Sequence, residues 1–242
     1  MALEPCDRGW HLLRDPRDVL ISGANYHSWS DEPWLHRPRE NLAGRTYQEA
    51  LCALSFADSV HFEMHHSTGQ AIRDMLAFDR CNGRFRDVAY EVLLEDHTGE
   101  VAGPLLRELG LAGDALDSAL AVYREQHPRG PRRKRPSLRG HIQNLDRAQW
   151  RYMYDPPLLA SFERQFPNAA LDLGYLASDS ILLVDDPPRR EAYRSIFLAN
   201  RGETVAALAR LDAALRLHES APPLLAAREL ITRCQPAKVS GS

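Results

Sequence analysis

Residue types near the start of the chain could together bind an anion. Arg14 follows a short apolar run, and Asp15 and Pro16 come directly after it. An aspartate oxygen can cap the first N–H groups of a helix, and proline suits the first helical position. Such a helix start attracts phosphate, which an arginine can bind in bidentate fashion. With the Ser22 hydroxyl, this stretch is a candidate phosphate site; the alternative is a surface arginine beside an ordinary helix cap.

The elements that would position these residues are a strand and a helix. Residues 10–13 form an apolar run suited to a buried strand, and Val19–Ile21 continue the segment as a buried helix. A second strand is predicted for Phe85–Tyr90, where the pattern alternates before it becomes apolar. Further helices are predicted for Leu42–Phe56, 57–78, a stretch ending at Leu109, Leu116–Gln126 and Ala192–Ile231.

Composition limits the class of protein. The chain has 242 residues, 44% hydrophobic and 26% charged, which is typical of a globular protein with one large domain or one plus a small one. A net charge of −3 argues against a nucleic-acid partner, and no apolar run reaches the roughly 20 residues of a membrane span. The four cysteines are scattered and residues 1–9 do not form a signal peptide, so we expect a cytoplasmic protein.

A pair of histidines on a predicted helix raises the question of a metal site. His61 and His65 are four residues apart, with Glu63 between them. The pattern differs from the His-Glu-x-x-His of zinc peptidases, and no third ligand is apparent. We therefore expect no metal here and favour a solvated or core-edge helix face.

Two loops carry residue types that suit a ligand. The loop after the first helix is rich in aromatic and histidine residues, which could line an acceptor pocket or pack on the core: Tyr26, His27, Trp29, Trp34 and His36. The basic, proline-rich stretch His127–Gly140 is either a solvated loop or a lid over an anionic cofactor.

The segment Arg14–Ser22 resembles the 3′-phosphate-binding segment of the sulfotransferases that use 3′-phosphoadenosine 5′-phosphosulfate. In that family, an arginine at a strand end and a serine eight residues later hold the 3′-phosphate, and Arg14 and Ser22 match in type and spacing. Tyr90 and Glu91 resemble the family's Tyr-Glu-Asp-Leu strand end, where the tyrosine lies near the adenine, although Val92 replaces the aspartate.

A second resemblance covers 141–175, where Trp150–Tyr175 is similar to the C-terminal end of a sulfotransferase domain. The family opens this region with a basic Arg-x-Gly element that also holds the 3′-phosphate, whereas residues 143–145 here read Gln-Asn-Leu. The loss of one charged contact would weaken phosphate binding by roughly 1.5–3 kcal/mol. Arg139 or Arg147 is the candidate to compensate.

The resemblance implies a fold and a domain plan. We expect a P-loop-type α/β sulfotransferase fold that lacks its N-terminal part, is mostly helical as it stands, and carries a helical C-terminal extension. The expected parts are a partial sulfotransferase domain at 1–175, a linker at 176–190, and a tetratricopeptide-like helical hairpin at 191–234.

The resemblance also implies a function. A member of the family transfers a sulfuryl group from 3′-phosphoadenosine 5′-phosphosulfate to a hydroxyl or amine acceptor, and this chain would do so if completed by the missing N-terminal elements. The expected ligands are that donor and adenosine 3′,5′-bisphosphate. The family's loop lysine and upstream histidine have no match here, so the catalytic residues are unknown.

The alternative is a non-catalytic nucleotide-binding or protein-interaction protein derived from a sulfotransferase. The acceptor is not identified, no membrane is expected, and a second copy or a complementing chain is the expected protein partner.

Overall fold

The computed structural model describes residues 8–79, 83–130, 138–139, 145–176 and 183–234. The chain divides into two compact units, each built from two segments. The first unit comprises Met1–Asp15 and Arg73–Arg135, and the second comprises Pro16–Ile72 and Pro136–Ser242. This division does not test the boundaries expected at 175 and 190, which stay predictions.

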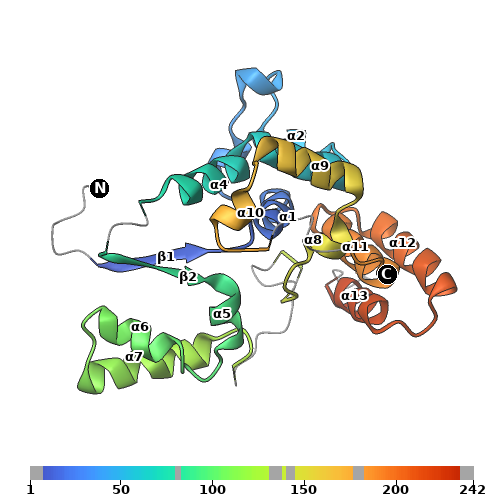
Figure 1. Cartoon of the computed structure of the whole chain (residues 1–242). Helices are drawn as coiled ribbons and strands as arrows, with labels where there is room; N and C mark the ends of the chain where they lie inside the picture. The colour runs from blue at the N-terminus through green and yellow to red at the C-terminus, as the bar shows by residue number, and fades with distance from the viewer. Residues whose placement is uncertain (1–7, 80–82, 131–137, 140–144, 177–182, 235–242) are drawn as a thin grey trace. The chain divides into compact units, whose positions relative to one another are not determined.

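The first unit contains a parallel pair of strands. β1 (Gly9–Leu13) pairs with β2 (Phe85–Ala89), in a register that runs from Gly9 opposite Phe85 to Leu13 opposite Ala89 (Figure 1). Both strands were predicted to within one residue. Because the strands are parallel, the residues that follow them leave the sheet at the same edge.

Three helices complete the first unit: α5 (Tyr90–Glu95), α6 (Ala102–Glu108) and α7 (Gly113–Gln126). Ala102 of α6 shares a small apolar core with Leu116 and Leu120 of α7. The start of α6 is held by Asp96, whose Oδ2 accepts the N–H of Ala102 at 2.8 Å. Burial disfavours the charge of Asp96, but hydrogen bonds from this and neighbouring N–H groups outweigh it and lower the pKa of the carboxyl.

The second unit is helical, and the helix α4 (Ser67–Ala77) crosses from it into the first unit after Ile72. Its other helices are α1 (Pro16–His27), α2 (Tyr47–Cys52), α3 (Phe56–His65), α8 (Trp150–Met153), α9 (Pro156–Gln165), α10 (Ala169–Asp172), α11 (Pro187–Asn200), α12 (Thr204–Leu217) and α13 (Pro222–Arg233), with the short 3₁₀ turns η1 (Pro33–His36) and η2 (Glu40–Leu42).

The long helices predicted for 42–56 and 57–78 are wrong as continuous elements. Thr46 starts α2 with a capping box to Glu49, and the Ser55 side chain accepts the N–H of Asp58 to start α3. His66 then leaves helical geometry, with φ −124° and ψ −138°, before α4 begins. Hydroxyl caps start new helices, while the apolar periodicity continues across each break and hides it from a pattern search.

The last three helices share one core. α11 and α12 form a helical hairpin, and Gly202 adopts φ +88° at its turn, where a side chain would be strained. Ala207 and Leu211 of α12 are fully buried against Leu224 and Ile231 of α13. The hairpin is therefore extended by a third helix, which buries the face that two helices would leave open.

The chain is thus mostly helical with a two-stranded parallel sheet, consistent with the α/β class. Among the described residues, no helix has the length and apolar character needed to cross a membrane.

Candidate functional site

The strongest candidate site lies in the first unit, where the two strands end. Leu13 and Ala89 are the last paired residues, so Arg14 and Tyr90 follow them as neighbours at one edge of the sheet. The guanidinium carbon of Arg14 lies 5.0 Å from the centroid of the Tyr90 ring. A cation this close to an aromatic face is attracted by the ring's negative face. The structure therefore brings together two of the residues predicted from the sequence.

Glu91 lies at the same edge of the sheet. Its Oε1 accepts the backbone N–H of Asp15 at 3.2 Å, and this bond ties the turn after β1 to the start of α5. Asp15 is buried, whereas Arg14, Tyr90 and Glu91 are partly exposed. The edge thus presents a cation, an aromatic ring and a carboxylate within a few residues of backbone.

The other predicted ligand residues belong to the second unit. Ser22 is half-buried in the second turn of α1, and Arg147 is exposed before α8. Arg139 is exposed with φ +55°, its N–H donates to Asn200 Oδ1 at 3.0 Å, and its Nε donates to the Asn200 carbonyl at 3.2 Å. Their roles toward a phosphate stay predictions. Residues 131–137 and 140–144, which include most of the basic stretch and Gln143, lie outside the described residues.

The neighbouring charged residues of the same motif have structural roles. Arg17 is fully buried, with its guanidinium carbon 3.8 Å from the Trp150 ring centroid and its Nη2 donating to the Leu176 carbonyl at 3.1 Å. The Oδ1 of Asp18 accepts the N–H of Trp150, the first residue of α8, at 2.9 Å. The hydroxyl of Tyr154 donates to the Arg17 carbonyl at 3.1 Å. The start of α1 is thereby fixed to α8, which lies more than 130 residues away.

The aromatic loop after α1 packs on the core. Trp34 contacts the Tyr47 ring at 5.1 Å between centroids and lies against the apolar cluster around Leu35. The Tyr26 hydroxyl and Trp34 Nε1 both donate to the carboxylate of Glu32, at 2.8 and 2.5 Å. These contacts favour the core-packing alternative over an acceptor pocket.

Sequence reasoning missed a buried carboxylate in the second unit. Glu63 has no exposed surface, and its Oε1 lies 2.8 Å from His27 Nδ1. Its Oε2 accepts the N–H and hydroxyl of Thr68 at 3.2 and 2.5 Å. Burial, and then the charge of Glu63, raise the pKa of Tyr47 well above its usual range. The helical spacing could have predicted this burial, because Glu63 lies on the same helix face as the buried residues Val60 and Met64.

The histidines that flank Glu63 do not join this network. His61 and His65 are exposed, and their rings contact each other at 5.0 Å between centroids. Within the described ranges, no three His, Cys, Asp or Glu side chains come close enough to hold a metal ion.

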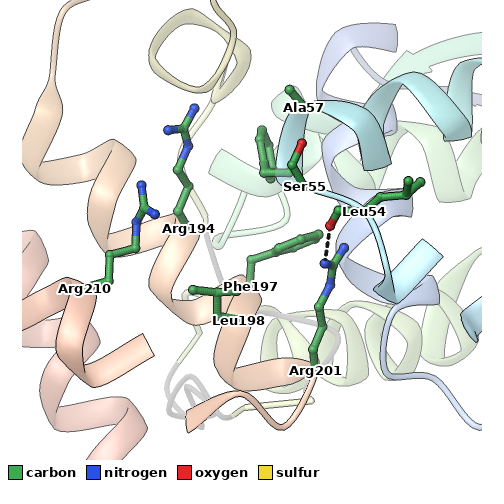
Figure 2. A pocket seen from close by; sticks show the side chains of 9 residues that line it. Leu54, Ser55, Ala57, Arg194, Phe197, Leu198, Arg201 and Arg210 are labelled. Atoms are coloured by element: carbon green, nitrogen blue, oxygen red, sulfur yellow. Dashed lines mark hydrogen bonds between the residues drawn. The ribbon is translucent and has the colours of Figure 1, made fainter. Parts of the chain in front are cut away.

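A pocket of about 360 Å³ lies in the second unit, between the start of α3 and the helices α11 and α12 (Figure 2). Its lining combines apolar side chains with three arginines: Arg194, Arg201 and Arg210. Burial lowers the pKa of Arg194 and of Arg201. This concentration of arginines was not predicted, because the residues that form the pocket are about 140 positions apart in the sequence.

No protein-family model, no curated protein and no solved structure matches the chain. The resemblance of Arg14–Ser22 to sulfotransferases therefore stays a prediction, to be tested by ligand binding.

Proposed function

We propose that the chain is a sulfotransferase-like protein that binds a 3′-phosphorylated adenine nucleotide at the edge formed by Arg14 and Tyr90. The observation that carries this proposal is the position of the Arg14 guanidinium, 5.0 Å from the Tyr90 ring centroid, where two parallel strands end. In open α/β sheets, ligands bind at the carboxyl ends of the strands. The proposal includes the finer assignment of the fold, a P-loop-type sulfotransferase domain.

Each residue at this edge has a chemical role in the proposal. A guanidinium that faces a ring directs its N–H donors outward in its own plane, where a phosphate can accept two of them. Tyr90 offers a flat apolar surface to the adenine. The carboxylate of Glu91 can accept a hydrogen bond from a ribose hydroxyl, as acidic residues do in other nucleotide sites. Ser22 is the second proposed phosphate ligand, from its spacing alone.

The reaction in the proposal is transfer of a sulfuryl group from 3′-phosphoadenosine 5′-phosphosulfate to a hydroxyl or amine acceptor. Such a transfer also needs positive charge at the leaving oxygen and a base for the acceptor proton. We assign neither role to a residue of this chain. Binding of the nucleotide and turnover of the donor are therefore tested separately.

Titration calorimetry with adenosine 3′,5′-bisphosphate tests the site. We expect Arg14→Ala to weaken binding by about tenfold or more, because it removes a charge-assisted contact to the 3′-phosphate. The same variant should leave binding of adenosine 5′-monophosphate, which lacks that phosphate, nearly unchanged. Arg86→Ala is the matched control, since Arg86 is an exposed arginine on β2 that pairs with Glu108.

Two results would contradict the assignment: absence of nucleotide binding by the intact chain, or equal losses for Arg14→Ala and Arg86→Ala. If the nucleotide binds, consumption of the sulfuryl donor decides the next question. Donor turnover with a hydroxyl or amine acceptor supports the transferase, and binding without turnover supports the non-catalytic alternative.

A further inference from the structure

The arginine pocket of the second unit has two kinds of wall. One is apolar and includes the rings of Phe56 and Phe197, whose centroids are 5.4 Å apart in an edge-to-face arrangement. The other is cationic, because Arg194 and Arg210 project from neighbouring helices on one side of the pocket while Arg201 reaches Leu54 (Figure 2). The volume of about 360 Å³ lies at the lower end of the range for small-molecule sites.

Arg201 is held by the protein itself. Its Nη1 donates to the carbonyls of Cys52 and Leu54, and its Nη2 donates to the Leu51 carbonyl and the Ser59 hydroxyl, at 2.7 to 3.3 Å. The guanidinium also lies 4.0 Å from the Phe197 ring centroid. Arg201 therefore contributes a fixed positive charge to the pocket: its terminal nitrogens already donate to the protein, and its Nε is buried without a partner.

Arg194, in contrast to Arg201, is not held by hydrogen bonds. It makes no hydrogen bond with any described residue, and its Nε is buried without a partner. Its contacts are a loose ion pair with Glu191 at 3.9 Å and the face of Phe56 at 5.7 Å. Only 28% of the side chain is exposed. A buried guanidinium N–H without a hydrogen bond is costly, and such groups normally have a partner.

Glu191 does not neutralise the pocket. It binds mainly Arg210, whose Nη2 donates to it at 2.9 Å and whose Nε is also within ion-pair distance. Asp155 acts on Arg194 and Glu203 on Arg201 from outside the cavity, but none of the described residues that line it is acidic. Ser55, Phe56 and Ala57, at the start of α3, line the same space, and the positive end of the helix dipole adds to its potential.

We propose that this pocket binds a small organic anion, a phosphate or sulfate monoester with an aromatic or short alkyl body, whose anionic group pairs with Arg194 and whose apolar body contacts Phe56 and Phe197. Arg210 and Arg201 supply further positive charge. A tetrahedral oxyanion suits this side of the pocket because it can accept several guanidinium N–H groups at once. The inference is independent of the nucleotide site, because none of the residues proposed for that site lines this pocket.

Phenyl phosphate is the probe, titrated into the full chain by calorimetry and by NMR. We expect saturable binding whose affinity falls as the salt concentration rises. Arg194→Gln should lower the affinity for phenyl phosphate about tenfold or more. Arg216→Gln is the control, because Arg216 is an exposed arginine on the same helix as Arg210. It should change the dissociation constant less than twofold. Phenol, which lacks the anionic group, should bind at least tenfold more weakly than phenyl phosphate.

Several outcomes would overturn the proposal. They are no binding of phenyl phosphate to the folded chain, equal affinity of wild type and Arg194→Gln, or equal affinity for phenol and phenyl phosphate. Thermal unfolding of each variant serves as the folding control. If Arg194→Gln fails to fold, Arg194→Lys replaces it, because it keeps the charge but loses the planar, bidentate donors; an unchanged affinity in that variant would equally reject the pairing with Arg194.

Discussion

The two ends of the arginine pocket hold the same residue type in opposite states. Arg201 donates four hydrogen bonds to protein acceptors, whereas Arg194, seven residues earlier in the chain, donates none to the described residues. In both side chains the Nε is buried without a partner. The difference teaches that a guanidinium whose terminal nitrogens donate to the protein is part of the fold, while one whose terminal nitrogens do not is open to a ligand.

The largest expected effect on the free energy of unfolding comes from replacing Arg201, whose terminal nitrogens donate to the protein. Arg201→Gln would leave three carbonyls and a hydroxyl at the ends of α2 and α3 without their donor, at a cost of roughly 3–5 kcal/mol in the free energy of unfolding. Arg194→Gln should change that free energy by less than about 1 kcal/mol, because no hydrogen bond is lost. Chemical denaturation measures the free energy of unfolding of both variants. Similar losses for the two would contradict the difference that we infer between Arg201 and Arg194.

Glu63 extends the comparison to a buried anion. Its two oxygens are satisfied by His27 and Thr68, so Glu63→Gln would place amide hydrogens against existing donors. We expect the free energy of unfolding to fall by about 2–4 kcal/mol. His61→Gln, an exposed change on the same helix, should cost less than about 0.5 kcal/mol. Equal values for the two variants in urea denaturation would show that the network does not stabilise the unit.

The smallest effect concerns Asp96 in the first unit. Its pKa is lowered from 3.8, so the stability it contributes is complete above that unfolded-state value and is lost as the pH falls through the lower folded-state value. Asp96→Ala should cost about 1 kcal/mol at neutral pH, the usual scale for losing an acceptor at a helix start. Unfolding followed by far-UV circular dichroism checks this. The gap between wild type and variant should close as the pH falls below 3.8, and a gap independent of pH would refute the assignment.

Local patterns predicted the strands and helix starts that depend on neighbouring residues. The alternation at 85–89 and the helix start at Pro16 were both predicted, because strand period and proline act within a few residues. Helix breaks at Thr46 and Ser55 were missed, since apolar periodicity does not record a cap. The site at the sheet edge could be predicted only in part. Arg14 and Tyr90 each follow a predicted strand, but the contact between them depends on the register in which the strands pair.

Sequence alone determined which residues are charged, where the two strands end and that a helix begins at Pro16. Only the tertiary structure decided which of those charged groups find hydrogen-bond or ring partners within the protein. Arg14, Arg17, Arg194 and Arg201 are equivalent in composition, yet Arg17 lies buried on Trp150 and Arg201 binds carbonyls about 150 residues earlier. The physical reason is that a guanidinium's state depends on the acceptors and rings that distant segments bring to it, and no local pattern encodes those partners.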